Sequence, residues 1–467
     1  MDNLQAAEKS IQKAKEIAEK CPYRPAFHFL APANWMNDPN GPIFYKGEYH
    51  LFYQHNPYED KWGQIHWGHA KSQDLVHWDH LPLALIPSNE LGEEHCFSGY
   101  CIISDGVPTI IYTSIGLQKN PSTSAEQWLA SSPDDMKTWQ KSRQNPILTL
   151  DVHKDLDVRD WRDPYVWREK DYWYMILGGH IHNTKTGATF LYKSKNLMKW
   201  EYIHPLYQGK KISKMTGMNW ECPNFFHLGE TYVLIVSPHK KVIYNVGNYK
   251  NHKFIPGNWR YLDHGRVFYA ANTMIDTQGR IIMWAWVRGG GTGGWNGCLT
   301  LPRILTLDQK RNLRITPAPE LQILRTSKIH LEDINISPLS SRILKEIHGK
   351  CLEIVAEFEI INPGEFGFKI FQSKDRKQFE TIKFNMEKKQ LSVGKEKGKI
   401  ESPINKQKII FHIFIDKSVI EVFFNYSECL TSRIYPISDS FENIEIYATE
   451  GIIRLASFDI WELKSIW

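Results

Sequence analysis

The sequence has no long apolar run, no cysteine pair with redox or metal spacing, and no basic arm. None of its apolar segments approaches the roughly 18 consecutive residues that would span a bilayer, so no membrane partner is expected. Lys and Arg number 57 against 52 Asp and Glu, and a formal net charge of +5 is mild for 467 residues. Because these charges are spread along the chain, nucleic acid is not the expected partner either.

Cysteine is scattered in this chain. The sequence has 7 cysteines and no CxxC pair, and an odd, dispersed set is typical of reduced thiols. Reduced thiols predict a cytoplasmic location. Residues 1–22 agree with that location, because they lack the apolar core of a signal peptide and predict a polar helical extension with Leu4, Ile11 and Ile17 as its few apolar points.

Helical periodicity is almost absent after residue 20, and short β-rich runs recur instead. Five apolar strand candidates centre on Phe52, Tyr112, Tyr174, Ile235 and Trp284, at steps of 60, 62, 61 and 49 residues. A second signal, in Trp78, Trp139 and Trp200, recurs at steps of 61. Two signals with one period predict an all-β, five-bladed β-propeller over residues 23–325, with these tryptophans packed between blades.

A third element precedes each of these strands and is expected to be the innermost strand of its blade. The five candidates are residues 37–45, 96–103, 161–167, 221–228 and 268–275. Inner strands of a propeller converge on one axis, so their first residues should meet at one mouth. Three of them carry a carboxylate there, namely Asp38, Asp163 and Glu221. Folding alone does not favour three acids in one mouth, so we expect a functional site.

The repeats stop near residue 325. Residues 326–350 are polar and without pattern, which predicts a linker. Short alternating strands resume over 351–467 with a different spacing and predict an antiparallel β-sandwich. Its role stays open between packing, sugar binding and homo-oligomer formation.

Two carboxyl groups flanking a sugar bond are the minimum for glycoside hydrolysis, one ionised and one protonated. Asp38 lies among Asn37 and residues 39–41, whose amides can stabilise an ionised carboxylate. Asp163 follows Arg162, which should keep it ionised. Glu221 lies between Trp220 and Cys222-Pro223, an apolar setting that should raise its pKa and suit a general acid.

Three segments carry a family resemblance. They are Trp35-Met36-Asn37-Asp38-Pro39-Asn40-Gly41, Trp161-Arg162-Asp163-Pro164 and Glu221-Cys222-Pro223. They resemble the signature boxes of glycoside hydrolase family 32, the family of invertases, fructanases and sucrose-6-phosphate hydrolases. Further similar segments are FSG (97–99), GWNGCLTLPR (294–303) and IDKSVIEVFFN (415–425), so the likeness covers nearly the whole chain.

The resemblance implies a propeller followed by a sandwich and a retaining, two-step β-fructofuranosidase without metal or cofactor. It assigns Asp38 as nucleophile, Glu221 as general acid/base and Asp163 as transition-state stabiliser. Its fructose pocket falls on Asn37, Gln54, Trp62, Phe97, Ser98, Arg162, Tyr269 and Trp286. The expected reaction releases terminal non-reducing β-D-fructofuranosyl units from sucrose, sucrose 6-phosphate or short fructans.

Two departures from the family pattern bear on the leaving group. Asn224 stands where the third box is usually followed by Asp, and Arg266-Val267 stand where an acidic residue often precedes Phe268-Tyr269-Ala270. A basic loop over 208–214 favours either solvent or a substrate phosphate. The alternatives that remain are an inverting propeller glycosidase of another family, a fructosyltransferase and a non-catalytic fructan-binding protein.

Overall fold

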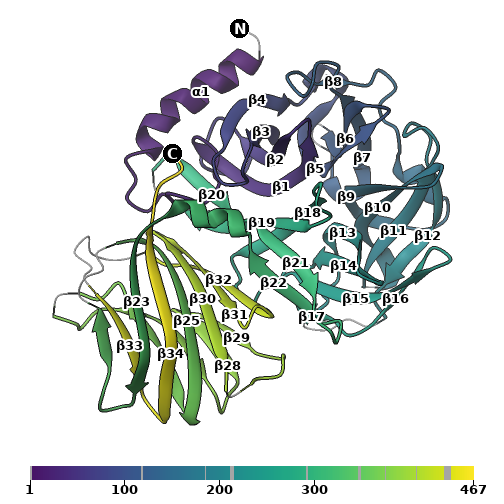
Figure 1. Ribbon diagram of the computed structural model, residues 1–467. Coiled ribbons are helices and arrows are strands. Elements are labelled where there is room, and N and C mark those ends of the chain that lie inside the picture. The colour runs from purple at the N-terminus through teal and green to yellow at the C-terminus, as the bar shows by residue number, and fades with distance from the viewer. Residues whose placement is uncertain are drawn as a thin grey trace. The chain divides into compact units, whose positions relative to one another are not determined.

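Figure 1 shows the computed structural model, which describes residues 3–116, 119–184, 186–210, 215–290, 293–344, 349–373, 375–405, 407–435 and 443–467. The chain forms two compact units. One comprises residues 1–21, 29–262 and 269–311, and the other comprises 22–28, 263–268 and 312–467. None of the described helices is both long and apolar enough to cross a membrane.

The amino-terminal helix is α1 (Asn3–Ala18), as predicted. It buries Ala7 and Ala18 rather than its larger apolar residues, and Ile17 is 56% exposed. Small residues on the inner face let a largely polar helix lie close to its neighbours. The other helical segments are single turns, α2 (Pro121–Ser124), η1 (Asn89–Leu91), η2 (Leu150–His153), η3 (His182–Thr184) and η4 (Pro319–Leu324).

The first unit is the five-bladed propeller (Figure 1). Blade one consists of β1 (Asn34–Tyr45), β2 (Glu48–Asn56), β3 (His66–Ser72) and β4 (Asp79–Leu85). Blade two consists of β5 (Glu93–Ser104), β6 (Val107–Gly116), β7 (Glu126–Ser131) and β8 (Gln140–Lys141). Blade three consists of β9 (Val158–Glu169), β10 (Tyr172–Ile181), β11 (Gly187–Ser194) and β12 (Glu201–Gln208).

The remaining blades follow the same order. Blade four consists of β13 (Glu221–Leu228), β14 (Thr231–Ser237), β15 (Ile243–Lys250), β16 (Lys253–Pro256) and β17 (Arg260–Tyr261). Blade five contains β18 (Phe268–Ile275), β19 (Ile281–Gly290), β20 (Trp295–Leu299) and β21 (Arg303–Leu307). β20 pairs in parallel with β1, where Asn34 faces Trp295, so the ring is closed by backbone hydrogen bonds between its two ends. All five predicted inner strands are therefore strands β1, β5, β9, β13 and β18.

Repeated tryptophans pack between blades, as the period predicts. The Trp78 ring of blade one lies 6.3 Å from the Trp284 ring of blade five, measured between centroids. Trp139 of blade two meets Phe52 of blade one edge-on at 5.5 Å. Such contacts let each blade bury a face that it cannot bury alone.

The inner strands of blades one to four each carry a β-bulge at the same place. In every case three residue steps on the inner strand oppose two on its neighbour. These steps run from Met36 to Pro39, from Cys96 to Gly99, from Arg162 to Tyr165 and from Glu221 to Asn224. A bulge re-aims side chains that the ladder would otherwise hold in strict alternation. Asp163 and Cys222 adopt positive φ values of 64° and 46° within these bulges, a backbone strain that is found most often at functional sites.

The second unit is a sandwich of two antiparallel six-stranded sheets (Figure 1). One sheet, in spatial order, is β23 (Arg325–Ile336), β34 (Ile452–Leu463), β25 (Cys351–Asn362), β30 (Ile409–Asp416), β31 (Val419–Phe424) and β32 (Glu428–Arg433). The other is β24 (Arg342–Leu344), β33 (Ile444–Ala448), β26 (Glu365–Ile370), β27 (Glu380–Asn385), β28 (Gln390–Val393) and β29 (Glu396–Lys399). Among the described residues, the buried core between them consists of Ile, Leu, Val, Phe and Ala side chains. β22 (Leu313–Pro317) precedes η4.

The predicted linker over 326–350 is wrong for most of its length. Residues 325–336 form β23, which pairs with β34 along nearly its whole length, and residues 342–344 form β24. β23 is an edge strand with a mostly polar exposed face. Its apolar residues Ile329, Leu331, Ile334 and Ile336 do alternate and pack against the core, but a polar stretch precedes them and the alternation changes phase at Asp333.

Candidate active site

A cavity of about 200 Å³ in the propeller collects almost every residue that the sequence predicts for the site. Its lining comprises Trp35, Asn37, Asp38, Gln54, Trp62, Phe97, Arg162, Asp163, Glu221, Tyr269 and Trp286. These residues come from all five blades. Of the predicted residues only Ser98 does not line the cavity, and it lies directly behind Asp38.

Asp38 is held by uncharged donors. Ser98 donates to its Oδ2 at 2.7 Å, and the Asn37 amide donates to its Oδ1 at 3.1 Å. Gln54 supports both donors, since its Oε1 accepts from Asn37 at 2.7 Å and its Nε2 donates to Ser98 at 2.6 Å. Burial raises the pKa of Asp38, these hydrogen bonds oppose the rise, and the charge of Glu221 adds to it. The donors to Asp38 are thus the Asn37 side-chain amide and the Ser98 hydroxyl, rather than the amides of residues 39–41.

Asp163 is buried beside Cys222. The Cys222 backbone N–H donates to its Oδ2 at 2.9 Å, while Arg162 lies 4.0 Å from the same oxygen. Burial raises the pKa of Asp163 to about 7, and the charges of Glu221 and Asp38 add to the rise against the opposing effect of Arg162. The prediction that Arg162 keeps Asp163 ionised is therefore wrong, because the guanidinium turns towards Glu221.

Glu221 receives three donors. Arg162 and the His239 ring bind its Oε1, the latter at 2.7 Å, and the Tyr269 hydroxyl donates to its Oε2. Burial alone would raise the pKa of Glu221, but Arg162 and the hydrogen bonds from His239 and Tyr269 outweigh it and lower the pKa to about 2. The predicted apolar setting with a raised pKa is thus wrong for the free site.

Cys222 links the two aspartates. Its Sγ lies 3.5 Å from Asp38 Oδ2 and 3.5 Å from Asp163 Oδ2. Two acids that are 125 positions apart in the chain therefore face one another across a single side chain. Nearby carboxylates in a buried site shift one another's pKa upward, as both aspartates show.

Aromatic rings surround these acids. Trp62 is 52% exposed at the rim, with its ring centroid 6.3 Å from that of Phe97. Trp35 and Trp286 meet edge-on at 5.5 Å on another wall of the cavity. Exposed flat rings beside hydrogen-bonding acids are suited to sugar recognition.

The two departures from the family pattern lie away from the cavity. Asn224 is buried between inner strands, where its amide donates to the carbonyls of Cys222 and Ala271 and accepts from Thr273. A carboxylate has no proton for those two carbonyls, so the amide has a structural role here. Arg266 pairs with Glu396 at 3.1 Å. The expectation that these two positions alter the leaving-group side is not supported by their contacts.

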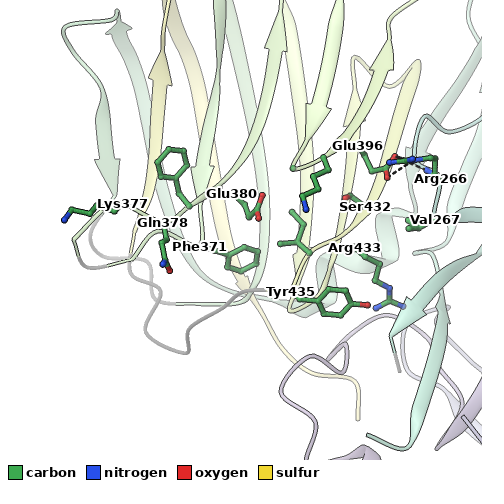
Figure 2. A pocket seen from close by; sticks show the side chains of 14 residues that line it. Arg266, Val267, Phe371, Lys377, Gln378, Glu380, Glu396, Ser432, Arg433 and Tyr435 are labelled. Carbon is green, nitrogen blue, oxygen red and sulfur yellow. Dashed lines mark hydrogen bonds and ion pairs between the residues drawn. The ribbon is translucent and has the colours of Figure 1, made fainter. Parts of the chain in front are cut away.

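A larger cavity of about 640 Å³ lies in the sandwich unit (Figure 2). It is bordered by Arg266, Glu396, Glu380 and the half-exposed ring of Tyr435. None of the predicted site residues lines it. The larger of these two cavities is therefore not the one that contains the three acids.

Four contributors were not predicted as site residues. Trp35 lines the cavity, Cys222 bridges the aspartates, Thr113 accepts from the Asp163 N–H at 3.0 Å, and His239 binds Glu221. Lys211 and Lys214 of the predicted basic loop lie outside the described residues. Among the described residues, no group of three or more His, Cys, Asp or Glu is arranged to hold a metal ion.

Comparison with known proteins accounts for this geometry. The family model described as "Glycosyl hydrolases family 32 N-terminal domain" matches residues 28–317. The model described as "Glycosyl hydrolases family 32 C terminal" matches residues 320–462. The chain belongs to glycoside hydrolase family 32. The family resemblance and the predicted fold, a propeller followed by a sandwich, are confirmed.

Relatives in family 32 cover the whole chain. A sucrose-6-phosphate hydrolase of Zymomonas mobilis subsp. mobilis is 34% identical over 502 residues, covering 99% of this chain and 96% of that protein. A levanase of Bacillus subtilis is 33% identical, covering 95% of this chain and 71% of that protein. The crystal structure of fructan 1-exohydrolase IIa from Cichorium intybus is 27% identical with a TM-score of 0.85, covering 95% of this chain and 98% of that one.

Proposed function

We propose that this family 32 member is a β-fructofuranosidase that releases terminal non-reducing fructose from small saccharides. The observation that carries the proposal is the meeting of Asp38, Asp163 and Glu221 in one cavity walled by aromatic rings. Its volume of about 200 Å³ lies below the roughly 300–1,000 Å³ of pockets for drug-sized ligands, which suits one sugar ring at the end of a chain.

The mechanism assigns one task to each acid. Asp38 attacks the anomeric carbon of fructose and forms a fructosyl-enzyme, while Glu221 protonates the departing oxygen. Glu221 then takes a proton from the water that hydrolyses the intermediate. Asp163, with a pKa of about 7, hydrogen-bonds sugar hydroxyls and strengthens those bonds as charge develops on the ring.

The substrates proposed are sucrose and sucrose 6-phosphate, with short fructans third. The names of the relatives in Zymomonas mobilis and Bacillus subtilis support this range without separating its members. All seven cysteines are described and none forms a disulfide bond, which supports the proposed cytoplasmic location. Association through the sandwich stays a prediction.

The test is a hydrolysis panel of sucrose, sucrose 6-phosphate, raffinose, inulin and levan, scored for free fructose. Release from the disaccharides at a higher kcat/KM than from inulin or levan is the expected result. Comparing free fructose with the free leaving group separates hydrolysis from transfer, since a fructosyltransferase releases less fructose than leaving group. Saccharide binding without any release would overturn the proposal.

A further inference from the structure

Both oxygens of Glu221 accept hydrogen bonds in the free site, although its proposed task is to donate a proton. Its two oxygens accept from Arg162, His239 and Tyr269, and these donors lower its pKa to about 2. These contacts favour the ionised form of Glu221 in the free site. A group that contacts Glu221 is therefore the place to look for the proton that the leaving group needs.

His239 is placed to hold that proton. It lies two residues beyond Ser237, which is the register partner of Glu221 across β13 and β14. Its Nε2 lies 2.7 Å from Glu221 Oε1, and its ring is 56% exposed, so it can exchange protons with solvent. The backbone N–H of His239 donates to the Tyr269 hydroxyl at 3.0 Å. This bond holds the backbone at His239 against Tyr269, which is itself a donor to Glu221.

The other two donors to Glu221 are unsuited to this task. Arg162 keeps its proton at all relevant pH values, because the charges around it raise its pKa further. Burial raises the pKa of Tyr269 well above its ordinary value. Imidazole is the one of the three side chains that ordinarily titrates near neutral pH.

The charged and titratable groups that face His239 come from three strands. Glu221 on β13 accepts its hydrogen bond and has the largest effect, raising the pKa of His239 above its ordinary value. Arg162 on β9 opposes this, whereas Asp160 on the same strand adds to it. The Tyr269 hydroxyl on β18 touches its backbone, and Lys240 and Lys241 follow it in the chain. On balance these groups raise the pKa of His239, so its ring keeps its charge to higher pH than an ordinary histidine does.

We propose that His239 is a positioning residue that stores the proton which Glu221 gives to the leaving group. The inference rests on the proposed function. A charged His239 beside an ionised Glu221 and a neutral His239 beside a protonated Glu221 contain the same number of protons, so the two residues titrate as one pair.

The proton moves in two transfers. It passes from His239 Nε2 to Glu221 Oε1, and from Glu221 to the glycosidic oxygen as the bond from that oxygen to the anomeric carbon breaks and the bond to Asp38 forms. In the second half of the reaction Glu221 takes a proton from the attacking water. Glu221 then passes this proton back to His239. No oxidant or further reactant is needed.

The pair predicts a specific pH profile. kcat/KM for sucrose should stay high until His239 loses its proton, and should fall as pH rises through the raised pKa of His239. Without His239 the falling limb is set by Glu221 alone, which Arg162 still holds at a low pKa. The limb should therefore move to lower pH by at least about one unit.

The decisive variant is His239→Gln, which retains a hydrogen-bond donor but stores no proton. We expect kcat/KM for sucrose at pH 7 to fall about 10- to 100-fold, with less loss at lower pH. An aryl β-fructofuranoside with a good leaving group needs no acid and should change by about twofold or less. His77→Gln is the matched control, because His77 is also half-exposed and pairs with a carboxylate, Asp74, at 2.8 Å.

A second variant separates proton storage from folding. Imidazole added to His239→Ala should restore part of the sucrose activity and move the falling limb back, since a half-exposed site admits it. A His239→Gln profile that coincides with that of the wild type, or equal losses on sucrose and the aryl fructoside, would overturn the inference while leaving the proposed function intact. Absence of fructose release by the wild-type enzyme would instead overturn both.

Discussion

Both units of the molecule bury carboxylates, but they treat them differently. In the sandwich unit Asp416 accepts from the buried His28 ring at 2.8 Å and from the backbone N–H groups of Ala26, Phe27 and His28. Glu353 is bound by Arg325 and His412, and Glu428 by His264. Although burial works the other way, these partners lower the pKa of Asp416, Glu353 and Glu428.

The propeller leaves two of its acids without such partners. Asp38 has only neutral donors, and the nearest cation to Asp163 is Arg162 at 4.0 Å. Burial raises the pKa of both. Removing a buried acid from a close cationic partner leaves that partner unpaired and destabilises the fold, whereas a buried acid without such a partner stores free energy that a reaction can use. The comparison predicts that substitutions in the two units should separate activity from stability.

Asp38→Asn should have the largest effect on activity. Loss of the nucleophile should lower kcat/KM for sucrose by at least about 1,000-fold. The melting temperature should stay the same or rise, because the amide needs no desolvation of charge. Sucrose kinetics and thermal unfolding of the same preparation measure the loss of activity and the melting temperature. A lowered melting temperature would show that Asp38 stabilises the fold, as the buried acids of the sandwich unit do.

Glu221→Gln should have the second-largest effect on activity. kcat/KM for sucrose should fall roughly 10²- to 10⁴-fold, the range that general acid catalysis supplies. The same parameter for an aryl β-fructofuranoside with a good leaving group should be largely preserved. Equal losses on the two substrates would argue against an acid role for Glu221.

Asp416→Asn should act on stability instead. It leaves His28 buried with a weakened acceptor at a fully buried site, so we expect a loss of about 3–5 kcal/mol in the free energy of unfolding. kcat/KM per folded molecule should be unchanged. Urea unfolding measures the first and active-site-normalised kinetics the second, with Asp135→Asn as an exposed control that should change neither.

Asp163→Asn should give the smallest effect on stability, and one opposite in sign to that of Asp416→Asn. A carboxyl whose pKa is raised on folding binds more protons when folded, so its contribution opposes folding increasingly as pH rises from about 4 to about 7. The variant should therefore gain about 1–2 kcal/mol over wild type at pH 8 and nothing at pH 4. Chemical unfolding at both pH values is the measurement; a gain that does not depend on pH would contradict the raised pKa.

The inner strands and the acids that they carry could be predicted from the sequence, because repeats of about 60 residues mark equivalent positions in each blade. The pKa directions of Asp163 and Glu221 could not. They depend on where the Arg162 guanidinium lies, which is against Glu221 and 4.0 Å from Asp163, and this direction is not readable from the sequence. Adjacency in sequence suggested the wrong partner for the guanidinium.

His239 and β23 were missed for different reasons. β14 runs antiparallel to β13, so the residues that follow Ser237 return to the start of the third box. The predicted order of these two strands already contained that signal. β23 offered a weaker signal, because its alternation at Ile329, Leu331, Ile334 and Ile336 changes phase at Asp333 and follows a polar stretch. Pairing order is therefore a better guide to site residues than proximity in the chain.

The central claim is that Asp38 attacks the sugar while Glu221 serves the leaving group and the water. Glu221→Gln incubated with an aryl β-fructofuranoside tests it most directly, because the first step then needs no acid and the second lacks its base. Mass spectrometry of the digested protein should find one fructosyl unit on the peptide that contains Asp38. A fructosyl unit on Asp163, or no adduct in a preparation whose wild-type counterpart cleaves sucrose, would contradict the account.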